Sequence, residues 1–404
     1  MNISNTTTTA PDYDWEWPGE RHWYWPSYWE YWEQILLAVL LGLVAITGLI
    51  GNSMIIAAVA FSKKLQTSTN AFVTSLGVAD LLTSFTLVWY VVGLLGENEW
   101  PIPGAYWICQ LTGFMIFACI GTSMWTLGMI AINRLILLIK PIWYEKIFTS
   151  WKLAILVAIP WVIPEAFLLT LHVTGDVTYA YAVEECSVWA HSGVFIIVQS
   201  VIGLIPPLLA IVGSYIWIYV YIKKYFRRQK QHLSQFSDSS TNDDSQSPGM
   251  QNTTSKFMIT EEGHDPNSDN AVQRRKQISK QEIEITKNLF VVVIGFFACF
   301  IPYFIMHSFR ESTINNANIE HAFFYVKGIP FINSVINFII YAMKHPDFKV
   351  VLRHMMRCSY ADIPQPSPIL KYLLSRKNQK PDSRLQDEVP ENTTMLGLGT
   401  TELN

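Results

Sequence analysis

The feature that most constrains the fold of this chain is a series of seven long apolar stretches separated by polar segments. Each stretch is long enough to cross the hydrocarbon core of a bilayer, which takes about 20 residues of α-helix. Half of the 404 residues are hydrophobic, and they occur in blocks rather than in alternating or amphipathic patterns. The sequence therefore predicts an all-α membrane protein, a bundle of seven transmembrane helices. The stretches are residues 35–61, 71–95, 106–139, 151–172, 191–222, 285–309 and 322–343.

The basic residues orient these spans. An odd number of spans places the two termini on opposite sides of the membrane, and short loops rich in Lys and Arg stay in the cytoplasm. Basic residues follow the first, third, fifth and seventh spans, as at Lys63 and Lys64, whereas the segment 96–105 contains none. We therefore expect a multi-pass plasma-membrane protein with an extracellular N-terminus and a cytoplasmic C-terminus.

The segments outside the spans differ in character. Residues 1–34 contain six Trp, which fit either an aromatic belt at the membrane interface or a lid over an extracellular pocket. Residues of about 224–281 and residues 359–404 are interpreted as too polar to fold, so we expect a disordered third intracellular loop and a disordered cytoplasmic tail. Between the last span and that tail, residues 344–358 predict a short amphipathic helix on the membrane, with Cys358 as a palmitoylation site.

Two further features depend on this orientation. Asn2 and Asn5 lie in Asn-X-Ser/Thr sequons on the expected outer side, where they can be glycosylated. Cys109 begins the third span, and Cys186 lies in the next outer loop. Because both cysteines face the oxidising compartment, we expect them to form a disulfide.

Polar residues inside a membrane are costly, so they mark positions with a function. The second span carries Asp80, the third Ser123, and the seventh Asn333 and Asn337. One carboxylate together with several hydroxyl and amide groups suggests a site for a small hydrated cation. Glu165 in the fourth span has no obvious partner: it is either protonated and inert, a contact with a neighbouring helix, or a contact between two copies of the chain.

The landmarks of the seven spans, taken in order, resemble those of rhodopsin-like (class A) G-protein-coupled receptors over about residues 35–358. One such match is weak evidence, whereas seven in order with the right spacing are specific. The landmarks are Asn52 in "GN", Asp80 in "LGVAD", Cys109 lying 25 residues before Arg134, Trp161, Pro207 followed eight residues later by Tyr215, Pro302 in "CFIP", and Tyr341 ending "NFIIY".

The chain departs from the usual pattern of these receptors at two positions. Asn133 stands where an Asp is usual, and Phe338 stands where the seventh span usually has a proline. Melatonin receptors and insect Moody-type receptors also have Asn-Arg at the first position, and melatonin receptors lack the proline too. The resemblance is therefore nearest to melatonin-receptor-like and Moody-type receptors.

The resemblance implies a receptor that binds an extracellular ligand and activates a heterotrimeric G protein through outward movement of the sixth helix. In similar receptors, acids hold the arginine that corresponds to Arg134 in the inactive state. Here the candidate acid on the sixth helix is Glu282, and release would turn Arg134 toward Tyr215 and Tyr341. The arginine suits such a role because its charge is permanent and its fork can change partners. Alternatively, Glu282 belongs to a solvated loop end and never meets Arg134, whose side chain then only snorkels to the membrane surface.

The same resemblance implies two further sites. Asp80, Ser123, Asn333 and Asn337 match the allosteric sodium site, and sodium there would favour the inactive packing. Phe300, beside the kink-forming Pro302, stands where many relatives have a tryptophan under the ligand, although plain packing explains it equally well. The outer halves of the spans predict a ligand pocket lined by Tyr90, Ile116, Phe117, Gln199, Phe300, His307 and Lys327.

This pocket narrows the class of ligand by exclusion. Ile116 occupies the position where amine receptors have an ammonium-binding Asp, and Phe331 the position of a retinal-binding lysine, so neither ligand class is expected. An apolar, aromatic pocket with a few polar groups suits a small molecule. Lys327 and Arg310 would instead attract a carboxylate or an acidic peptide.

The implied partners are an extracellular small-molecule or peptide ligand, a heterotrimeric G protein, arrestin, receptor kinases and membrane lipids. Nucleic acid is not among them, and no His-Glu-X-X-His or Gly-X-Ser-X-Gly motif indicates an enzyme. A transporter would show repeated halves with broken helices, which these spans do not. A protein with the receptor fold that does not signal stays an alternative, because Asn133 and Phe338 depart from the usual residues of two motifs involved in activation.

Overall fold

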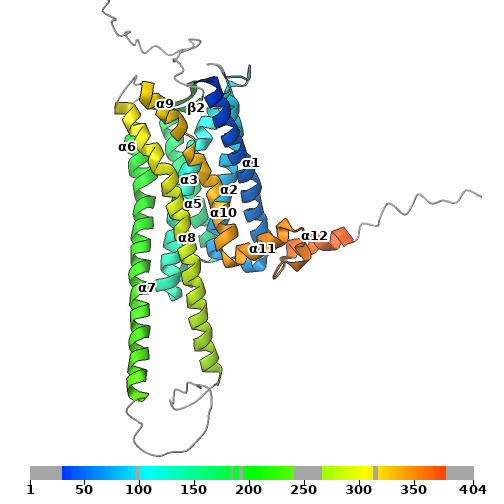
Figure 1. Cartoon of the computed structure of the whole chain (residues 1–404), viewed down its shortest axis with the longest axis vertical. Helices are drawn as coiled ribbons and strands as arrows, with labels where there is room; N and C mark the ends of the chain where they lie inside the picture. Colours follow the sequence, from blue (N-terminus) through cyan, green and yellow to red (C-terminus); the bar gives the residue numbers. More distant parts are fainter. Residues whose placement is uncertain are drawn as a thin grey trace, which may run out of the picture.

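The computed structural model describes residues 30–96, 100–182, 185–190, 194–240, 266–312 and 317–378. The sequons at Asn2 and Asn5 and nearly all of the Trp-rich tail lie outside these ranges. Within them, seven helical segments are long and apolar enough to cross a membrane, which confirms the predicted all-α bundle. Spans that follow one another in the sequence run in opposite directions, and all seven lie in a single bundle (Figure 1).

Six of the spans are single helices, and the seventh consists of three elements. They are α1 (Tyr31–Phe61), α2 (Ser68–Leu94), α3 (Tyr106–Ile139), α5 (Ser150–Val173), α7 (Ile205–Ser240), α8 (Pro266–Ser312), and the series α9 (Ala317–Val326), η3 (Ile329–Ile332) and α10 (Asn333–Lys344). The fifth span is preceded by the short helix α6 (Val194–Val198) and a π-helical turn, η2 (Gln199–Leu204). Proline at position 330 lies in η3, so the irregular backbone of the seventh span occurs before Phe338.

Helix α3 is the central element of the bundle. In the most apolar 18-residue stretch of α3, 67% of the residues are buried, against 17% in the corresponding stretch of α5. Helix α3 therefore packs between other helices, while α5 faces mainly lipid. Small residues allow this close packing. A Cβ at Gly121 of α3 would come within 2.8 Å of the Cβ of Pro164 on α5, so only glycine fits there without a shift.

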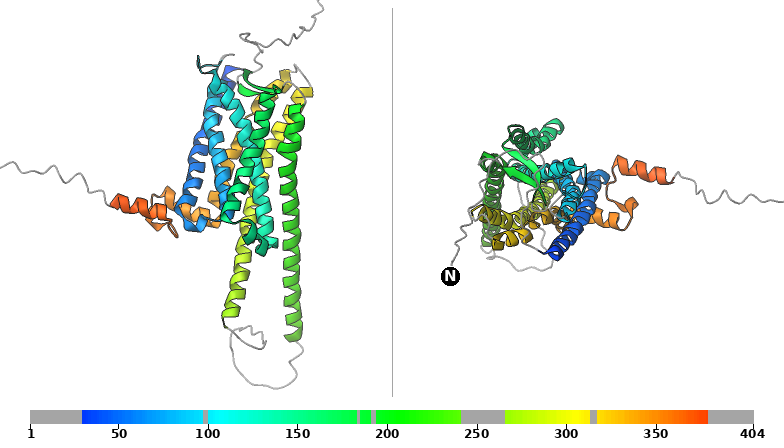
Figure 2. Two further views of the ribbon diagram at one scale, coloured as in Figure 1. Left: turned by 180° about the vertical axis from the view of Figure 1, so that it is seen from behind. Right: turned by 90° about the horizontal axis from the view of Figure 1, so that it is seen from above.

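The outer end of the bundle is covered by an antiparallel pair of strands, β1 (Val177–Ala182) and β2 (Glu185–Ala190). Cys186 on β2 forms the predicted disulfide with Cys109 at the start of α3, with their Cα atoms 5.2 Å apart. The strands cross above the helices when the bundle is seen from its outer end (Figure 2). The disulfide therefore joins this cover to the central helix.

At the inner end, the prediction of a disordered segment over about 224–281 is wrong in part. Helix α7 continues to Ser240 and α8 begins at Pro266, so both extend well beyond the other spans (Figure 1). Gln, Lys, Arg and Glu are frequent in these extensions and are good helix formers, which a reading of polarity alone ignores. Residues 241–265 lie outside the described ranges.

The prediction of a disordered tail from residue 359 is also wrong over its first part. After α11 (Pro346–Met356), which lies within the predicted amphipathic stretch, come a short turn η4 (Tyr360–Asp362) and a further helix, α12 (Pro368–Asn378). Ile363 and Leu370 are each only 2% exposed. A few apolar residues at the right positions thus order a segment whose average composition is polar. Residues 379–404 lie outside the described ranges.

Candidate functional site

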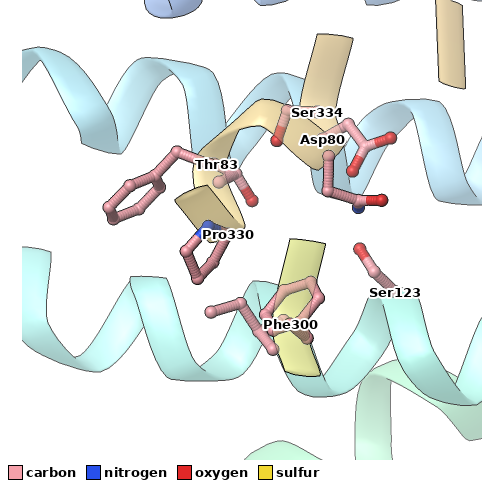
Figure 3. Close-up of a pocket in the computed structure, with 9 residues that line it drawn as sticks. Asp80, Thr83, Ser123, Phe300, Pro330 and Ser334 are labelled. Carbon is pink, nitrogen blue, oxygen red and sulfur yellow. The ribbon is translucent and has the colours of Figure 1, made fainter. Parts of the chain in front are cut away.

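A small cavity lies in the middle of the bundle beside Asp80 (Figure 3). The volume of the cavity is about 10 Å³. That is about the minimum needed to hold one water molecule, so only a small species fits. The lining residues come from α2, α3, α8, η3 and α10, and they are Asp80, Thr83, Ile120, Ser123, Phe300, Pro330, Phe331, Asn333 and Ser334.

Oxygen atoms dominate the polar side of this cavity. Asp80 is 1% exposed, and its Oδ2 accepts a hydrogen bond of 2.7 Å from Nδ2 of Asn337. The Ser123 hydroxyl also hydrogen-bonds to Asp80, which it approaches from the facing helix (Figure 3). The side-chain oxygens of Asn333 and Asn337 are buried, and no described residue is a hydrogen-bond partner for them. The four residues predicted for a cation site are therefore brought together.

The chemistry of this donor set suits a small, hard cation. A carboxylate, a hydroxyl and amide oxygens are the ligands that such ions prefer, and buried oxygens without a partner are otherwise unfavourable. In the part of the chain that the structure describes, no three His, Cys, Asp or Glu side chains are grouped to hold a metal ion. With one carboxylate, the site matches a single positive charge better than a divalent or transition metal.

Phe300 connects this cavity to α8. Its ring lines the cavity and stacks on Phe296 with centroids 4.3 Å apart and an interplanar angle of 26°. Pro302 follows two residues later in the same helix. A rotation of α8 at this level would therefore change both the shape of the cavity and the packing below it.

Phe338, one of the two departures from the usual pattern, has a packing role between α10 and α1. A Cβ at Gly51 would lie 2.6 Å from Cγ of Phe338, so the ring occupies space that only glycine leaves open. The neighbouring Asn52 donates from Nδ2 to the carbonyl oxygens of Ser334, at 2.8 Å, and Gly48, at 2.9 Å. The first and seventh spans are thus joined beside the cavity by contacts that Phe338 itself helps to make.

Asn133, the other departure, pairs with α2. The Oγ1 hydroxyl of Thr69 donates a 2.6 Å hydrogen bond to Oδ1 of Asn133, which is fully buried. Nothing in the sequence pattern singles out Thr69. The amide at this position therefore joins the inner ends of the second and third spans.

Arg134 is 3% exposed at the inner end of α3, so it is buried rather than snorkelling. It lies near enough to Tyr215 and Tyr341 to interact electrostatically with both. Both tyrosine hydroxyls are buried and have no hydrogen-bond partner among the described residues. The ring of Tyr215 packs on Phe290 of α8 with centroids 4.8 Å apart. The side chain of Glu282, the predicted partner of Arg134, lies outside the described residues.

His345, the residue immediately before α11, lies beside the same inner region. Its Nδ1 accepts a hydrogen bond from the backbone N–H of Phe348 and so caps α11. Burial lowers the pKa of His345 to about 4, against the opposing effect of Asp347 and together with the positive charge of Arg134. The imidazole is therefore neutral at the pH of the cytoplasm.

The residues predicted for the ligand pocket fall into two groups. Tyr90 and Ile116 belong to one buried apolar cluster at the outer end, and Phe117 packs against it. Lys327 is 5% exposed, with its ammonium 5.0 Å from the ring centroid of Phe324, a member of the same cluster.

The other predicted pocket residues lie apart from this cluster. His307 contacts the rings of Tyr303 and Phe323. Gln199 lies in η2, and the side chain of Arg310 is outside the described residues.

Two acidic side chains make polar contacts between spans, and only the contact of Glu33 was not anticipated from the sequence. The Glu33 carboxylate, near the start of α1, accepts hydrogen bonds from Tyr325 and His321 of α9, which joins the outer ends of the first and seventh spans. Glu165 accepts a hydrogen bond from Thr122 of α3, so of the three alternatives for this residue the structure supports a contact with a neighbouring helix. Cys358 is exposed just after α11, and its palmitoylation stays a prediction.

Comparison with known proteins gives a consistent result. The chain matches the family "7 transmembrane receptor (rhodopsin family)" over residues 51–341. It is 24% identical over 339 residues to the 5-hydroxytryptamine receptor 1B of Equus caballus, covering 80% of this chain and 86% of that protein. For the Homo sapiens receptor of the same name the identity is 23% with the same coverage. These relatives do not support the predicted closeness to melatonin-receptor-like and Moody-type receptors. The crystal structure of squid rhodopsin shares the fold, with a TM-score of 0.64 at 17% identity over 92% of this chain and 99% of that one.

Proposed function

Because the chain belongs to the rhodopsin family of seven-transmembrane receptors, we propose that it binds an extracellular ligand and activates a heterotrimeric G protein. In this proposal, ligand binding at the outer end moves the inner part of α8 outward and opens the region around Arg134. Arrestin and receptor kinases are then further partners on the cytoplasmic side. The protein works at the plasma membrane, with α11 at the inner membrane surface.

The observation that carries this proposal is the packing around Arg134. The arginine is buried, and the hydroxyls of Tyr215 and Tyr341 beside it have no hydrogen-bond partner. Buried hydroxyls without a partner are unfavourable, so this packing leaves room for a second arrangement in which they are satisfied. Outward movement of α8 would separate Phe290 from Tyr215 and allow that exchange. A protein with two such packings can be shifted between them by a ligand that binds one more tightly.

Glu282 is the acid that we propose to hold Arg134 in the inactive packing. The residues three, four and seven positions after it, Ile285, Thr286 and Leu289, are buried. Helical spacing therefore assigns position 282 to the face of α8 that turns toward the bundle. Since Asn133 cannot supply a negative charge, Glu282 would be the main restraint on Arg134.

The cavity beside Asp80 is proposed as a sodium site that stabilises the inactive packing. Its oxygen donors and its small size support a desolvated monovalent cation. Because Phe300 lines the same cavity, rotation of α8 would alter the site, and an ion that binds only one arrangement favours that arrangement.

The ligand is proposed to bind among the apolar and aromatic residues at the outer end. Ile116 offers no negative charge to an ammonium group, although the relatives reported above are named as 5-hydroxytryptamine receptors. A mainly apolar small molecule or peptide fits the cluster around Tyr90, and Lys327 is the candidate partner for an acidic group on it.

The proposal is tested by measuring ligand-free activation of a panel of G proteins in cells, for the wild type and for Glu282→Ala. Removing the restraint should raise basal activation by at least about fivefold for one class of G protein, the lower range of typical allosteric coupling. Glu284→Ala is the matched control, because Glu284 lies on the same helix turn and is exposed. Surface expression is measured for all variants.

A rise for Glu282→Ala and none for Glu284→Ala would support the restraint and identify the class of G protein. Equal activation by both variants would contradict a specific role for Glu282. No activation by any variant at normal surface expression would count against signalling and favour a scaffold of receptor fold.

A further inference from the structure

The segment after α11 is attached to the inner end of α1 by main-chain hydrogen bonds. The N–H of Lys63 donates to the carbonyl of Gln365 at 2.9 Å, and the N–H of Ser367 donates to the carbonyl of Phe61 at 2.8 Å. Between them, Ser62 forms a β-bridge with Pro366. This pairing fixes residues 365–367 against the loop that follows the first span.

Side chains reinforce this attachment. The Ser62 hydroxyl donates to the carbonyl of Pro364 at 2.8 Å, and the ring of Tyr360 packs edge-on against Phe61 with centroids 6.2 Å apart. Ile363 and Leu370 are buried on either side of the bridge. Such burial offsets the entropy lost when a chain segment is ordered.

The attachment determines where α12 begins. Ser367 caps this helix, since its Oγ accepts a hydrogen bond of 3.2 Å from the N–H of Leu370. The same residue is bonded through its backbone to Phe61, the last residue of the first membrane span. Helix α12 therefore starts at the inner boundary of the membrane, beside the bundle.

Helix α12 has three different faces. At 100° per residue, Leu370 and Leu374 lie on one face, and they pack against the rest of the protein. Ile369, Tyr372 and Leu373, spaced three and four residues apart, lie on a second face and are 56%, 61% and 47% exposed. The third face carries the polar side chains of Lys371 and Ser375, and both are exposed.

The direction of α12 matches a membrane surface. It projects sideways from the bundle at the level of α11 and of the inner end of α1 (Figures 1 and 2). This is the level at which the inner lipid headgroups surround the spans, which end at Phe61 and Lys344. An exposed apolar face at this level can lie in the boundary between headgroups and acyl chains.

The charges around this face have the sign that the inner leaflet attracts. Lys371 and Arg376 of α12 are exposed, and Lys349, Arg353 and Arg357 lie on and just after α11. The cytoplasmic leaflet carries acidic lipids that attract basic residues near its surface. Long basic side chains next to an apolar face can keep their charge at the headgroups while their stems lie deeper.

We propose that α12 is a membrane-surface helix that binds the acidic inner leaflet beside the first span. Ile369, Tyr372 and Leu373 insert into the headgroup boundary. Arg376 lies on the same face at 100° per residue and contacts lipid phosphate and carboxylate groups, while Lys371 and Ser375 face the cytoplasm.

The test uses the full-length receptor in lipid nanodiscs of phosphatidylcholine with or without phosphatidylserine. In a Cys358→Ser background, one nitroxide label is placed at Leu373→Cys, and at Ser375→Cys as the matched control on the same helix. We expect the label at 373 to be relaxed more by membrane-dissolved oxygen and the label at 375 more by a water-soluble nickel complex. Retained thermal stability shows that the variants are folded.

Equal access of the nickel complex to both labels would overturn the proposal, because α12 would then lie in water. A label at 373 that neither reagent reaches would also overturn it, because another protein or a second copy would then cover this face. As a second measurement, Arg376→Gln should move the label at 373 toward water in nanodiscs with phosphatidylserine, and Lys371→Gln on the opposite face is the matched control. No change, together with no effect of phosphatidylserine on the wild type, would overturn the role of acidic lipid. Neither measurement depends on G-protein activation.

Discussion

The cavity beside Asp80 and the region around Arg134 are both buried and polar, but their hydrogen bonds are arranged differently. Around Asp80, Asn337 and Ser123 bond directly to the carboxylate, and Asn333 lines the same cavity. Around Arg134, the described residues offer no hydrogen-bond partner to the hydroxyls of Tyr215 and Tyr341, and the ring of Tyr215 packs on Phe290. The buried carboxylate of the first region already has hydrogen-bond partners, whereas the tyrosine hydroxyls of the second can gain partners in another packing.

This difference suggests that the two regions have different roles when the packing of the spans changes. A site whose donors converge can hold the spans in one packing when its ion is bound. A region that leaves polar groups unsatisfied is the place where a second packing gains most. Phe300, which lines the cavity and lies on the helix that also closes the inner end, provides the physical connection between them.

The largest expected effect is at the inner end. Arg134→Ala, made in the Glu282→Ala background, should reduce ligand-free G-protein activation by about ten- to a hundredfold, the equivalent of one hydrogen bond to a charged group. Arg134→Lys is the matched variant, since it keeps the charge but not the planar fork. If Arg134→Ala signals as strongly as its parent at equal surface expression, the inner region is not the switch.

The cavity should respond to sodium. Replacing potassium chloride by sodium chloride should raise the melting temperature of the purified wild type by about 2–4 °C for each kcal/mol of binding free energy. Asp80→Asn keeps the shape of the side chain and removes its charge, so it should abolish this difference. Thr86→Ala, on the same helix but away from the cavity, should retain it. A difference that persists in Asp80→Asn would place the sodium effect elsewhere.

Asn133 allows the comparison to be sharpened. Asn133→Asp keeps an oxygen for the Thr69 hydroxyl and adds a negative charge beside Arg134. It should therefore lower the basal activation of Glu282→Ala severalfold, because one of two restraints is supplied from the neighbouring position. Thr69→Val breaks the same hydrogen bond without adding charge and should cost about 1–3 kcal/mol of stability. Equal basal activation in Asn133→Asp and its parent would show that charge at this position does not restrain Arg134.

Several features could be predicted from the sequence, because they depend on local residue types or on the membrane environment. Apolar length determines the spans, and the position of Cys109 and Cys186 on the oxidising side determines the disulfide. Asp80 and its companions were predicted to converge because uncompensated polar groups inside a membrane are costly. Their function as a sodium site stays a prediction.

The features that escaped prediction depend on contacts between distant parts of the chain. The pairing of Ser62 with Pro366 is made by main-chain atoms, so no residue type marks it in advance. Phe338 was recognised only as a departure, since its fit against Gly51 is a matter of shape between two spans. Burial of Leu370 and Ile363 likewise becomes apparent only when α1 is beside them. Composition averages over such residues and so predicts disorder.

The smallest effect concerns His345, which links the inner region to α11. Its folded-state pKa of about 4 lies below the ordinary value of 6.5, mainly because of burial. Between these two values the unfolded chain binds more protons than the folded one, so this residue makes the protein less stable as the pH falls from about 6.5 to 4. His345→Asn keeps a cap for α11 and removes the titrating group. The melting temperature of the variant should therefore fall less than that of the wild type between pH 7 and pH 5. An equal fall would mean that the imidazole is solvated in the folded state and that this side of the inner region is open rather than packed.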